Sequence, residues 1–139
     1  MKKIVLISCV SKKLTQRAKA KDLYISTLFK LNLQFARQCK PDFIFILSAK
    51  YGLLNLDDEI DPYEMTLNKM SREDRTNWSA QVVRQLGSQA DLIQDHFIIL
   101  AGEKYRQFIL PMLCFYEIPL KGLPIGKQLQ QLKRSLKNG

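Results

Sequence analysis

Four short apolar runs, each followed by a segment with helical spacing of apolar residues, dominate the pattern along this chain. Continuous apolar character over five to seven residues is typical of strands that are buried on both faces of a sheet. The four predicted strands cover residues 3–8, 42–48, 97–101 and 114–118.

Apolar residues recur every three or four positions between these runs, which predicts amphipathic helices. The first predicted helix spans about 23–39 and ends before Pro41. Ser71, with Asp74 three positions later, resembles a capping box and begins the second helix. A short third helix starts at Glu103. The last helix carries Ile125, Leu129, Leu132 and Leu136.

Alternating strands and helices predict an α/β fold in a single domain over residues 1–139. We expect three layers, with a four-stranded, mainly parallel sheet and helices on both faces. Ligands of such sheets bind beyond the carboxyl ends of the strands. Loops that are distant in sequence should therefore meet at this edge. These loops are 9–21, 48–56, 102–105 and 119–126.

Charge changes this picture because it is unevenly distributed. The formal net charge is +9, and residues 1–40 carry ten Lys or Arg with one acid. Residues 120–139 add five Lys or Arg and no acid, whereas residues 41–70 are acidic. Basic clusters favour a polyanionic partner, since bound phosphates release their counterions. A solubilising charged surface is the alternative.

Other features of the composition exclude several classes of protein. Cys9, Cys39 and Cys114 form no CxxC pair, and His96 is the only histidine. We therefore expect no disulfide framework, no metal site and no cofactor. No apolar run approaches the roughly 20 residues of a membrane span, and the run after Lys3 is too short for a signal peptide. A cytoplasmic protein without membrane contact is expected.

The first of the four loops offers a thiol beside basic residues. Cys9 ends the first predicted strand and is followed by Ser11, Lys12 and Lys13. A thiol next to ammonium groups becomes more nucleophilic. The loop has no histidine to activate a cysteine protease. A small residue that fills space at the strand end is the plainer interpretation of Cys9.

The start of the first predicted helix adds candidates for binding an anion. Asp22 is expected to be the N-cap residue, with a catalytic acid/base role as the alternative. Lys21, Tyr24 and Ser26 are candidate ligand-binding residues, because backbone N–H groups at a helix start favour phosphate. No phosphate-binding glycine motif accompanies them.

The strongest local candidate follows the second predicted strand, at Ser48, Lys50, Tyr51 and Gly52. Gly52 permits a sharp turn or a close backbone approach. Tyr51 offers a ring on which a base can stack and a hydroxyl for hydrogen bonding. These residues predict a binding site at the end of this strand.

Pro62, Tyr63 and Glu64 form a further candidate. Glu64 is a carboxylate next to a rigid proline and an aromatic ring, and suits a general base or a ribose hydroxyl. The acidic residues at 57–61 fit no calcium loop and are more typical of a solvated surface. The two remaining loops contribute Gly102, Tyr105, Gly122 and Gly126.

Two of these segments resemble a known family. Leu47-Ser-Ala-Lys-Tyr-Gly-Leu-Leu and Glu59-Ile-Asp-Pro-Tyr-Glu are similar to segments of the YaaA-like peroxide-stress proteins. A small, largely uncharacterised bacterial family of the same superfamily is still more similar. It shares a Lys-Asp-Leu-Tyr-x-Ser helix start and a Pro-Leu-x-Gly-Leu-x-Ile-Gly segment, found here at 21–26 and 119–126.

The resemblance implies DNA binding and a role in stress response. It also implies a strand order like that of uracil-DNA glycosylases, with a flavodoxin-like order as the alternative. The chain is shorter than a YaaA-like protein and lacks the Gly-Gln-Asp-Pro-Tyr-His segment of the glycosylases. Base excision is therefore not implied.

Three functions remain as hypotheses. The first is binding of nucleic acid or a nucleotide, in which Lys12, Lys13 and Lys21 contact phosphate and Tyr51 or Tyr63 stacks on a base. The second is an N-glycosidase-like enzyme that uses Glu64 or Asp22 as acid/base. The third is a redox-responsive protein that uses the Cys9 thiol. The oligomeric state is not indicated.

Overall fold

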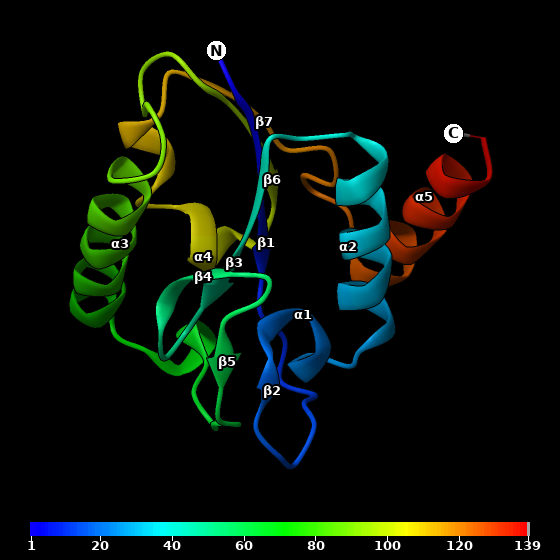
Figure 1. Ribbon diagram of the computed structural model, residues 1–139, viewed down its shortest axis with the longest axis horizontal. Helices are drawn as coiled ribbons and strands as arrows, with labels where there is room; N and C mark the ends of the chain where they lie inside the picture. The colour runs from blue at the N-terminus through cyan, green and yellow to red at the C-terminus, as the bar shows by residue number, and fades with distance from the viewer. Residues whose placement is uncertain (139) are drawn as a thin grey trace.

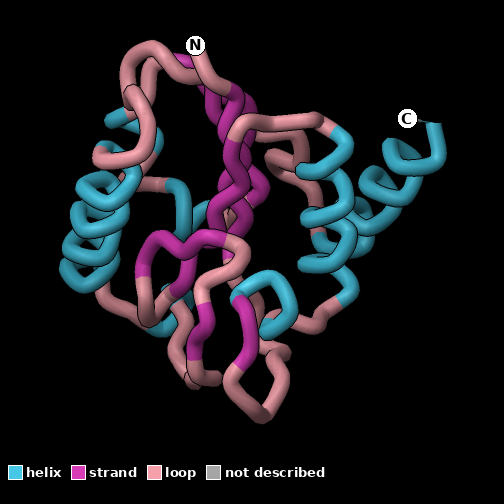
Figure 2. The backbone as a smooth tube through the Cα atoms, viewed as in Figure 1, coloured by secondary structure: helices cyan, strands magenta, loops and turns pink. Residues whose placement is uncertain are grey.

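The computed structural model describes residues 1–138. A mostly parallel central sheet divides the molecule, and helices cover both of its faces (Figures 1 and 2). In spatial order the strands are β4 (Gly52–Asn55), β3 (Phe43–Ser48), β1 (Lys3–Ser8), β6 (His96–Leu100) and β7 (Phe115–Glu117). The four strands β3, β1, β6 and β7 are parallel, as predicted, and β4 is antiparallel to β3.

Two pairs of helices form the outer layers. Helices α2 (Thr27–Gln38) and α5 (Ile125–Asn138) pack together on one side of the sheet, and α3 (Arg72–Gly87) lies with α4 (Glu103–Arg106) on the other (Figure 1). Two single turns of 3-10 helix complete the helical elements. η1 (Leu67–Lys69) precedes α3, and η2 (Leu110–Met112) follows α4. None of the helices within residues 1–138 has the length and apolar character needed to cross a membrane.

The central strands are buried because both of their faces are covered. Side chains 4–7 of β1 have no exposed surface, and their neighbours Phe45 and Ile46 in β3 and 97–100 in β6 are also buried. Each such Ile, Val or Leu side chain contributes about 1.5–3 kcal/mol by leaving water. The continuous apolar runs in the sequence therefore predicted these three strands correctly.

The prediction of four strands was wrong, because residues 48–56 do not form an irregular loop. The chain turns through three residues and returns as β4, with Ser48 opposite Gly52. Gly52 has a φ of 76°, the left-handed conformation that a three-residue hairpin turn requires. Leu53 and Leu54 are buried by this pairing, so a fifth strand extends the sheet.

A second, two-stranded sheet lies beyond the carboxyl ends of the parallel strands. Strand β2 (Ala18–Lys19), followed by α1 (Ala20–Leu23), pairs antiparallel with β5 (Glu59–Ile60). Figure 1 shows these elements together below the central sheet. The loops predicted at 9–21 and within 49–70 are therefore partly regular.

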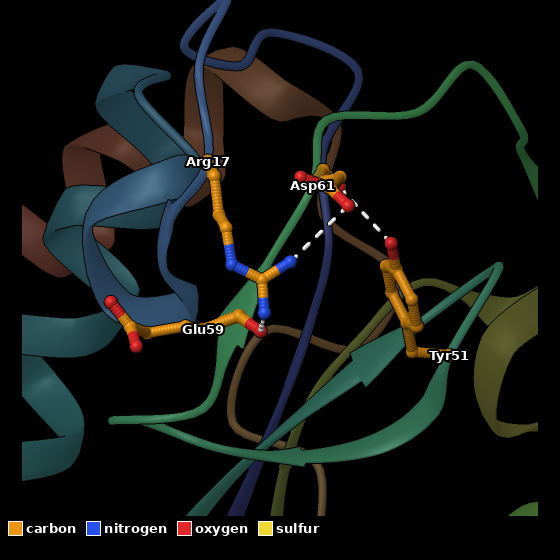
Figure 3. A network of polar contacts seen from close by, with 4 residues as sticks. All are labelled: Arg17, Tyr51, Glu59 and Asp61. Carbon is orange, nitrogen blue, oxygen red and sulfur yellow. Dashed lines mark hydrogen bonds and ion pairs between the residues drawn. The ribbon is translucent and has the colours of Figure 1, made fainter.

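Opposite charges hold this small sheet in place. Arg17 contacts the carboxylate of Asp61 at 3.2 Å and donates to the carbonyl oxygen of Glu59 at 3.0 Å, and Tyr51 donates to the carbonyl oxygen of Asp61 (Figure 3). Lys21 pairs with Asp57 at 3.3 Å. Exposed pairs of this kind contribute up to about 1 kcal/mol each. Part of the basic N-terminal region therefore neutralises the acidic segment of the same chain.

The first long helix begins later than predicted. Its N-cap is Ser26, whose Oγ accepts a hydrogen bond from the backbone N–H of Phe29 at 3.1 Å. Asp22 lies inside α1 and caps neither helix. The predicted cap at Ser71 is confirmed, because Ser71 Oγ accepts a bond from the N–H of Asp74.

Within the described residues, Cys9, Cys39 and Cys114 are free thiols. No three His, Cys, Asp or Glu side chains of residues 1–138 are grouped so that they could hold a metal ion. His96 starts β6, at the opposite end of the strand from the loops discussed below, and contacts Glu117 of β7 at 3.4 Å.

Candidate functional site

Two adjoining cavities lie where the parallel strands end. The first cavity, of about 660 Å³, is lined by residues that follow β1, β6 and β7, among them Cys9, Gly102 and Gly122. The second cavity, of about 830 Å³, is lined by residues that follow β1 and β3, including Lys13 and Lys50. All four predicted loops therefore contribute to one edge of the sheet, and the cavities adjoin along residues that both share.

The first cavity lies at the point where the sheet changes the direction of its connections. From β1 the chain proceeds to α2 on one face of the sheet, and from β6 it proceeds to α4 on the opposite face. The loops after these two neighbouring strands diverge and leave a crevice, which is the usual ligand position in open α/β sheets.

A buried chain of hydroxyl groups holds Tyr63, which borders the second cavity. Tyr63 and Tyr24 are joined through their hydroxyls at 2.7 Å, and Ser48 donates to the Tyr63 oxygen at 2.8 Å. Ser48 Oγ in turn accepts from the N–H of Tyr51, and the Ser48 carbonyl accepts from Trp78 Nε1 at 2.9 Å. Each of these polar groups has a partner, so the chain of hydroxyls fixes its members in place.

Burial raises the pKa of both phenols in this chain, to about 12 for Tyr24 and further for Tyr63. The phenols therefore remain protonated at neutral pH. They position their neighbours and do not act as bases.

Lys13 covers this chain from the solvent side. Its Nζ lies 4.4 Å from the centre of the Tyr63 ring and 5.7 Å from that of Tyr24, within range of a cation–π interaction. Partial burial lowers the pKa of Lys13, while the charges of Cys9 and Glu64 act in the opposite direction. The ammonium group also donates to the carbonyl oxygen of Ser11 at 3.2 Å.

Three lysines border the second cavity. Lys13 comes from the loop after β1, Lys50 from the turn after β3, and Lys69 from η1. Within residues 1–138 none of the three forms an ion pair, in contrast to Lys19 and Lys21. The second cavity therefore offers positive charge that its own carboxylates do not neutralise by direct contact.

Cys9 and Tyr105 form the wall of the first cavity. The thiol is 6% exposed, and its Sγ donates to the hydroxyl oxygen of Tyr105 at 3.5 Å. The same oxygen accepts the N–H of Leu67 at 3.4 Å, and the Tyr105 ring meets Trp78 edge-on. Burial raises the pKa of Tyr105 as well. The redox hypothesis for Cys9 stays a prediction. Because this residue is buried, an oxidant would have to reach its thiol through the first cavity.

A model described as "Family of unknown function (DUF6884)" matches residues 4–134. The chain belongs to this family. No curated protein and no solved structure matches it. The match contains no link to the YaaA-like proteins, so that resemblance stays a prediction.

In this family member, about half of the predicted site residues border a cavity. Those that do are Cys9, Ser11, Lys13, Lys50, Tyr63, Glu64, Gly102, Tyr105 and Gly122. Tyr24 and Ser48 lie beneath the cavities and hold Tyr63. The others border neither cavity; they are Lys12, Lys21, Asp22, Ser26, Tyr51, Gly52, Pro62 and Gly126.

Several of these residues have a structural role that explains their position. Lys21 is paired with Asp57, and Ser26 caps α2, so both have a structural role; their predicted role in anion binding stays a prediction. Tyr63 is 9% exposed, and its ring contacts Lys13, Tyr24 and Tyr51, so little of the ring can stack on a base.

The sequence predictions also missed residues of this family member that border the cavities. Lys69, Thr66 and Trp78 reach the second cavity from a segment and a helix that were predicted without any role in the site. Asn32, from α2, borders the first cavity. The sequence contains a signal for Asn32: it lies four positions after Leu28 and four before Ala36, which puts an amide on the buried face of the helix.

Proposed function

We propose that this chain binds a nucleotide or a nucleic-acid strand at the carboxyl edge of its parallel strands. The observation that carries the proposal is the set of three lysines, Lys13, Lys50 and Lys69, around the second cavity without ion-pair partners within residues 1–138. In this proposal their ammonium groups contact the phosphate, as in most protein contacts to nucleic-acid backbones.

Partial desolvation supports a special role for Lys13. An ammonium group that has lost water but has no counter-ion gains more from a bound anion than a fully solvated one does. Glu64 and Asp74 also border the second cavity, and their carboxylates suit the hydroxyls of a ribose. The pattern fits a phosphorylated sugar better than a simple inorganic anion.

The test compares two neighbouring lysines. Trp78 is the only tryptophan and borders the second cavity, so its fluorescence serves as the readout for titration with nucleoside monophosphates. Lys13→Ala should weaken nucleotide binding roughly ten- to hundredfold, the value of a charge-assisted hydrogen bond. Lys12→Ala removes the same charge from an exposed side chain that borders neither cavity, and should leave the affinity unchanged.

A short single-stranded oligonucleotide extends the same test to nucleic acid. The logarithm of its affinity should fall linearly with the logarithm of the salt concentration, and Lys13→Ala should reduce the slope by about 0.7. Equal losses in the two variants would point to general charge attraction and contradict the proposed site. No binding of nucleotides or oligonucleotides at low salt would end the proposal.

A second candidate function is hydrolysis of an N-glycosidic bond. The observation in its favour is Glu64, an exposed carboxylate at the border of the second cavity and close enough to Lys13 to influence its charge. In this reaction water bonds to the anomeric carbon of the sugar as the C–N glycosidic bond breaks, and a proton of the water passes to Glu64. The departing base takes a proton from solvent, and Glu64 then returns its proton to solvent. Asp22 is exposed and borders neither cavity, so this candidate depends on Glu64 alone.

Release of free base from nucleosides, nucleotides and oligonucleotides, followed by chromatography, tests this candidate. Glu64→Gln should lower the rate about 10²–10⁴-fold, the usual contribution of a general base, and this loss should exceed any loss of nucleotide affinity from the ribose contact. If the wild-type chain releases no base from any of these substrates, the binding function stands without the enzymatic one.

A further inference from the structure

The amide of Asn32 is buried without a partner. This side chain is 5% exposed, and its Oδ1 has no hydrogen-bond donor within residues 1–138. It extends from the buried face of α2, next to Leu33 and one turn after Phe29. Buried amide oxygens almost always accept a hydrogen bond, so an orphan acceptor on a residue that borders a cavity is available to a donor from a ligand.

The cavity around Asn32 suits an uncharged ring. Apolar side chains from α2, β6 and the loop before α5 form much of its wall. They are Leu28, Ile99, Leu100, Ile118, Leu120, Leu123 and Ile125. A planar group of low charge fits between apolar walls of this kind, with one amide to fix its orientation.

The two basic side chains at this cavity are committed to backbone carbonyls, and its third charged residue, Glu103, is acidic. Arg106 donates to the carbonyl oxygen of Ala101 at 2.7 Å, and Lys104 donates to that of Asn68 at 3.3 Å. Gln128 likewise donates to Leu123. These bonds leave the cavity less suited to a phosphate than the second cavity, where three lysines have no carboxylate partner.

The two cavities are continuous along one ridge. Ser11, Met65 and Thr66 border both of them. A ligand that lies across this ridge has one end among the lysines and the other end near Asn32. The ridge follows Glu64 directly in the sequence, so the bond between the two ends would lie beside the carboxylate considered above.

We propose that the first cavity receives the base of the nucleotide, and that a ring N–H or exocyclic amino group of that base donates to Asn32 Oδ1. This inference rests on the proposed function and specifies where the base lies. The side-chain amide pairs with an adjacent donor and acceptor on the base edge, as asparagine does with adenine in DNA complexes. Asn32 is then a residue that determines specificity.

The central experiment uses Asn32→Leu, with binding measured by calorimetry. The matched control is Ser79→Ala, because Ser79 also has a buried hydroxyl without a partner but borders neither cavity. Removing either orphan group should leave the melting temperature of the unliganded protein unchanged or higher. Asn32→Leu should weaken the binding of nucleoside monophosphates at least tenfold, and Ser79→Ala should not.

Ligand fragments separate this inference from the proposed function. Ribose 5-phosphate carries no base, so its affinity should be the same in the wild type and in Asn32→Leu. Nucleosides carry no phosphate, so their affinity should depend on Asn32 and not on Lys13. Ribose 5-phosphate that binds as tightly as nucleotides would contradict the base pocket and leave the phosphate site intact. If nucleosides bind through Asn32 as tightly as nucleoside monophosphates do, the phosphate contributes nothing. That result would support the base pocket and contradict the role of the lysines.

A second variant keeps the inference testable if Asn32→Leu fails to fold. Ile125 is 63% exposed and borders the first cavity, so Ile125→Phe adds bulk there without disturbing the core. This variant should weaken the binding of nucleotides and nucleosides, and leave the affinity for ribose 5-phosphate unchanged. Nucleotide affinities equal to those of the wild type in both variants would overturn the inference.

Discussion

At the scale of single residues, the site is defined by which polar groups have partners and which do not. Ser48, Tyr24 and Tyr63 satisfy one another and remain neutral, so they form a rigid support. Lys13 and Asn32 differ from them, since one is a partly desolvated cation without an ion pair and the other is a buried amide with an orphan oxygen. Within residues 1–138, a cation without an ion pair and an amide oxygen without a donor therefore border adjoining cavities, which fits a ligand with two chemically different ends.

The lowered pKa of Lys13 leads to a prediction about pH. A bound phosphate favours the charged ammonium and raises the pKa of Lys13. At a pH where Lys13 of the free protein is partly deprotonated, binding therefore takes up a proton. Affinity should be constant between the second pKa of the phosphate, about 6, and the lowered pKa of Lys13, then fall by up to about tenfold per pH unit as the pH rises through that pKa.

Lys13→Arg is the matched control for this pH profile, because a guanidinium stays charged to a pH above about 12. Its affinity for a nucleoside monophosphate should fall less steeply than that of the wild type between neutral and alkaline pH. Calorimetry measures both profiles at constant ionic strength. Parallel profiles would show that Lys13 does not contact the phosphate.

At the scale of elements, the hairpin of β3 and β4 explains why Gly52, which was predicted as a site residue, has a structural role. Gly52 closes the hairpin with a positive φ, and an added Cβ would meet the Gln85 side chain. That side chain accepts the N–H of Leu53 at 2.9 Å and thereby joins α3 to the edge of the sheet. The turn glycine serves the fold and only indirectly the cavity.

Gly52→Ala should therefore lower the free energy of unfolding by about 1–3 kcal/mol, the usual cost of backbone strain at such a position. Nucleotide affinity should change little as long as the protein is folded. Gly87→Ala is the control, since Gly87 ends α3 with a normal φ and an added Cβ would make only an ordinary contact with Leu92 at 3.8 Å, so alanine there should stabilise by up to about 1 kcal/mol. Urea denaturation measures the free energy of unfolding of both variants. A Gly52→Ala protein that is as stable as the wild type but binds nucleotides more weakly would contradict the structural role of Gly52.

At the scale of the whole molecule, the distribution of charge has a different meaning in three dimensions than along the chain. Arg17, Lys19 and Lys21 neutralise the acidic segment at 57–61, so a basic N-terminal region in the sequence is partly an internal ion-pair surface. The lysines that stay without ion pairs at the second cavity come from three distant segments, and only Lys13 belongs to the basic N-terminal cluster.

Local patterns predicted the parallel strands, the cap at Ser71 and the edge at which the loops meet. Buried strands need continuous apolar residues, and helix caps need a hydroxyl at one position, so both are visible in a single segment. The strand β4 was missed because four residues with a polar end carry too little periodicity. Its formation depends on the neighbouring β3 and on Gln85.

The sequence alone therefore determined the fold class and the edge of the sheet at which the two cavities lie, because these follow from the order of strands and helices. Only the tertiary structure decided which polar residues are satisfied: it paired Lys21 with Asp57, used Ser26 as a cap, enclosed Tyr63 and left Asn32 without a donor. The physical reason is that satisfaction of a charge or a hydrogen bond depends on partners from distant segments, and those partners meet only when the chain folds.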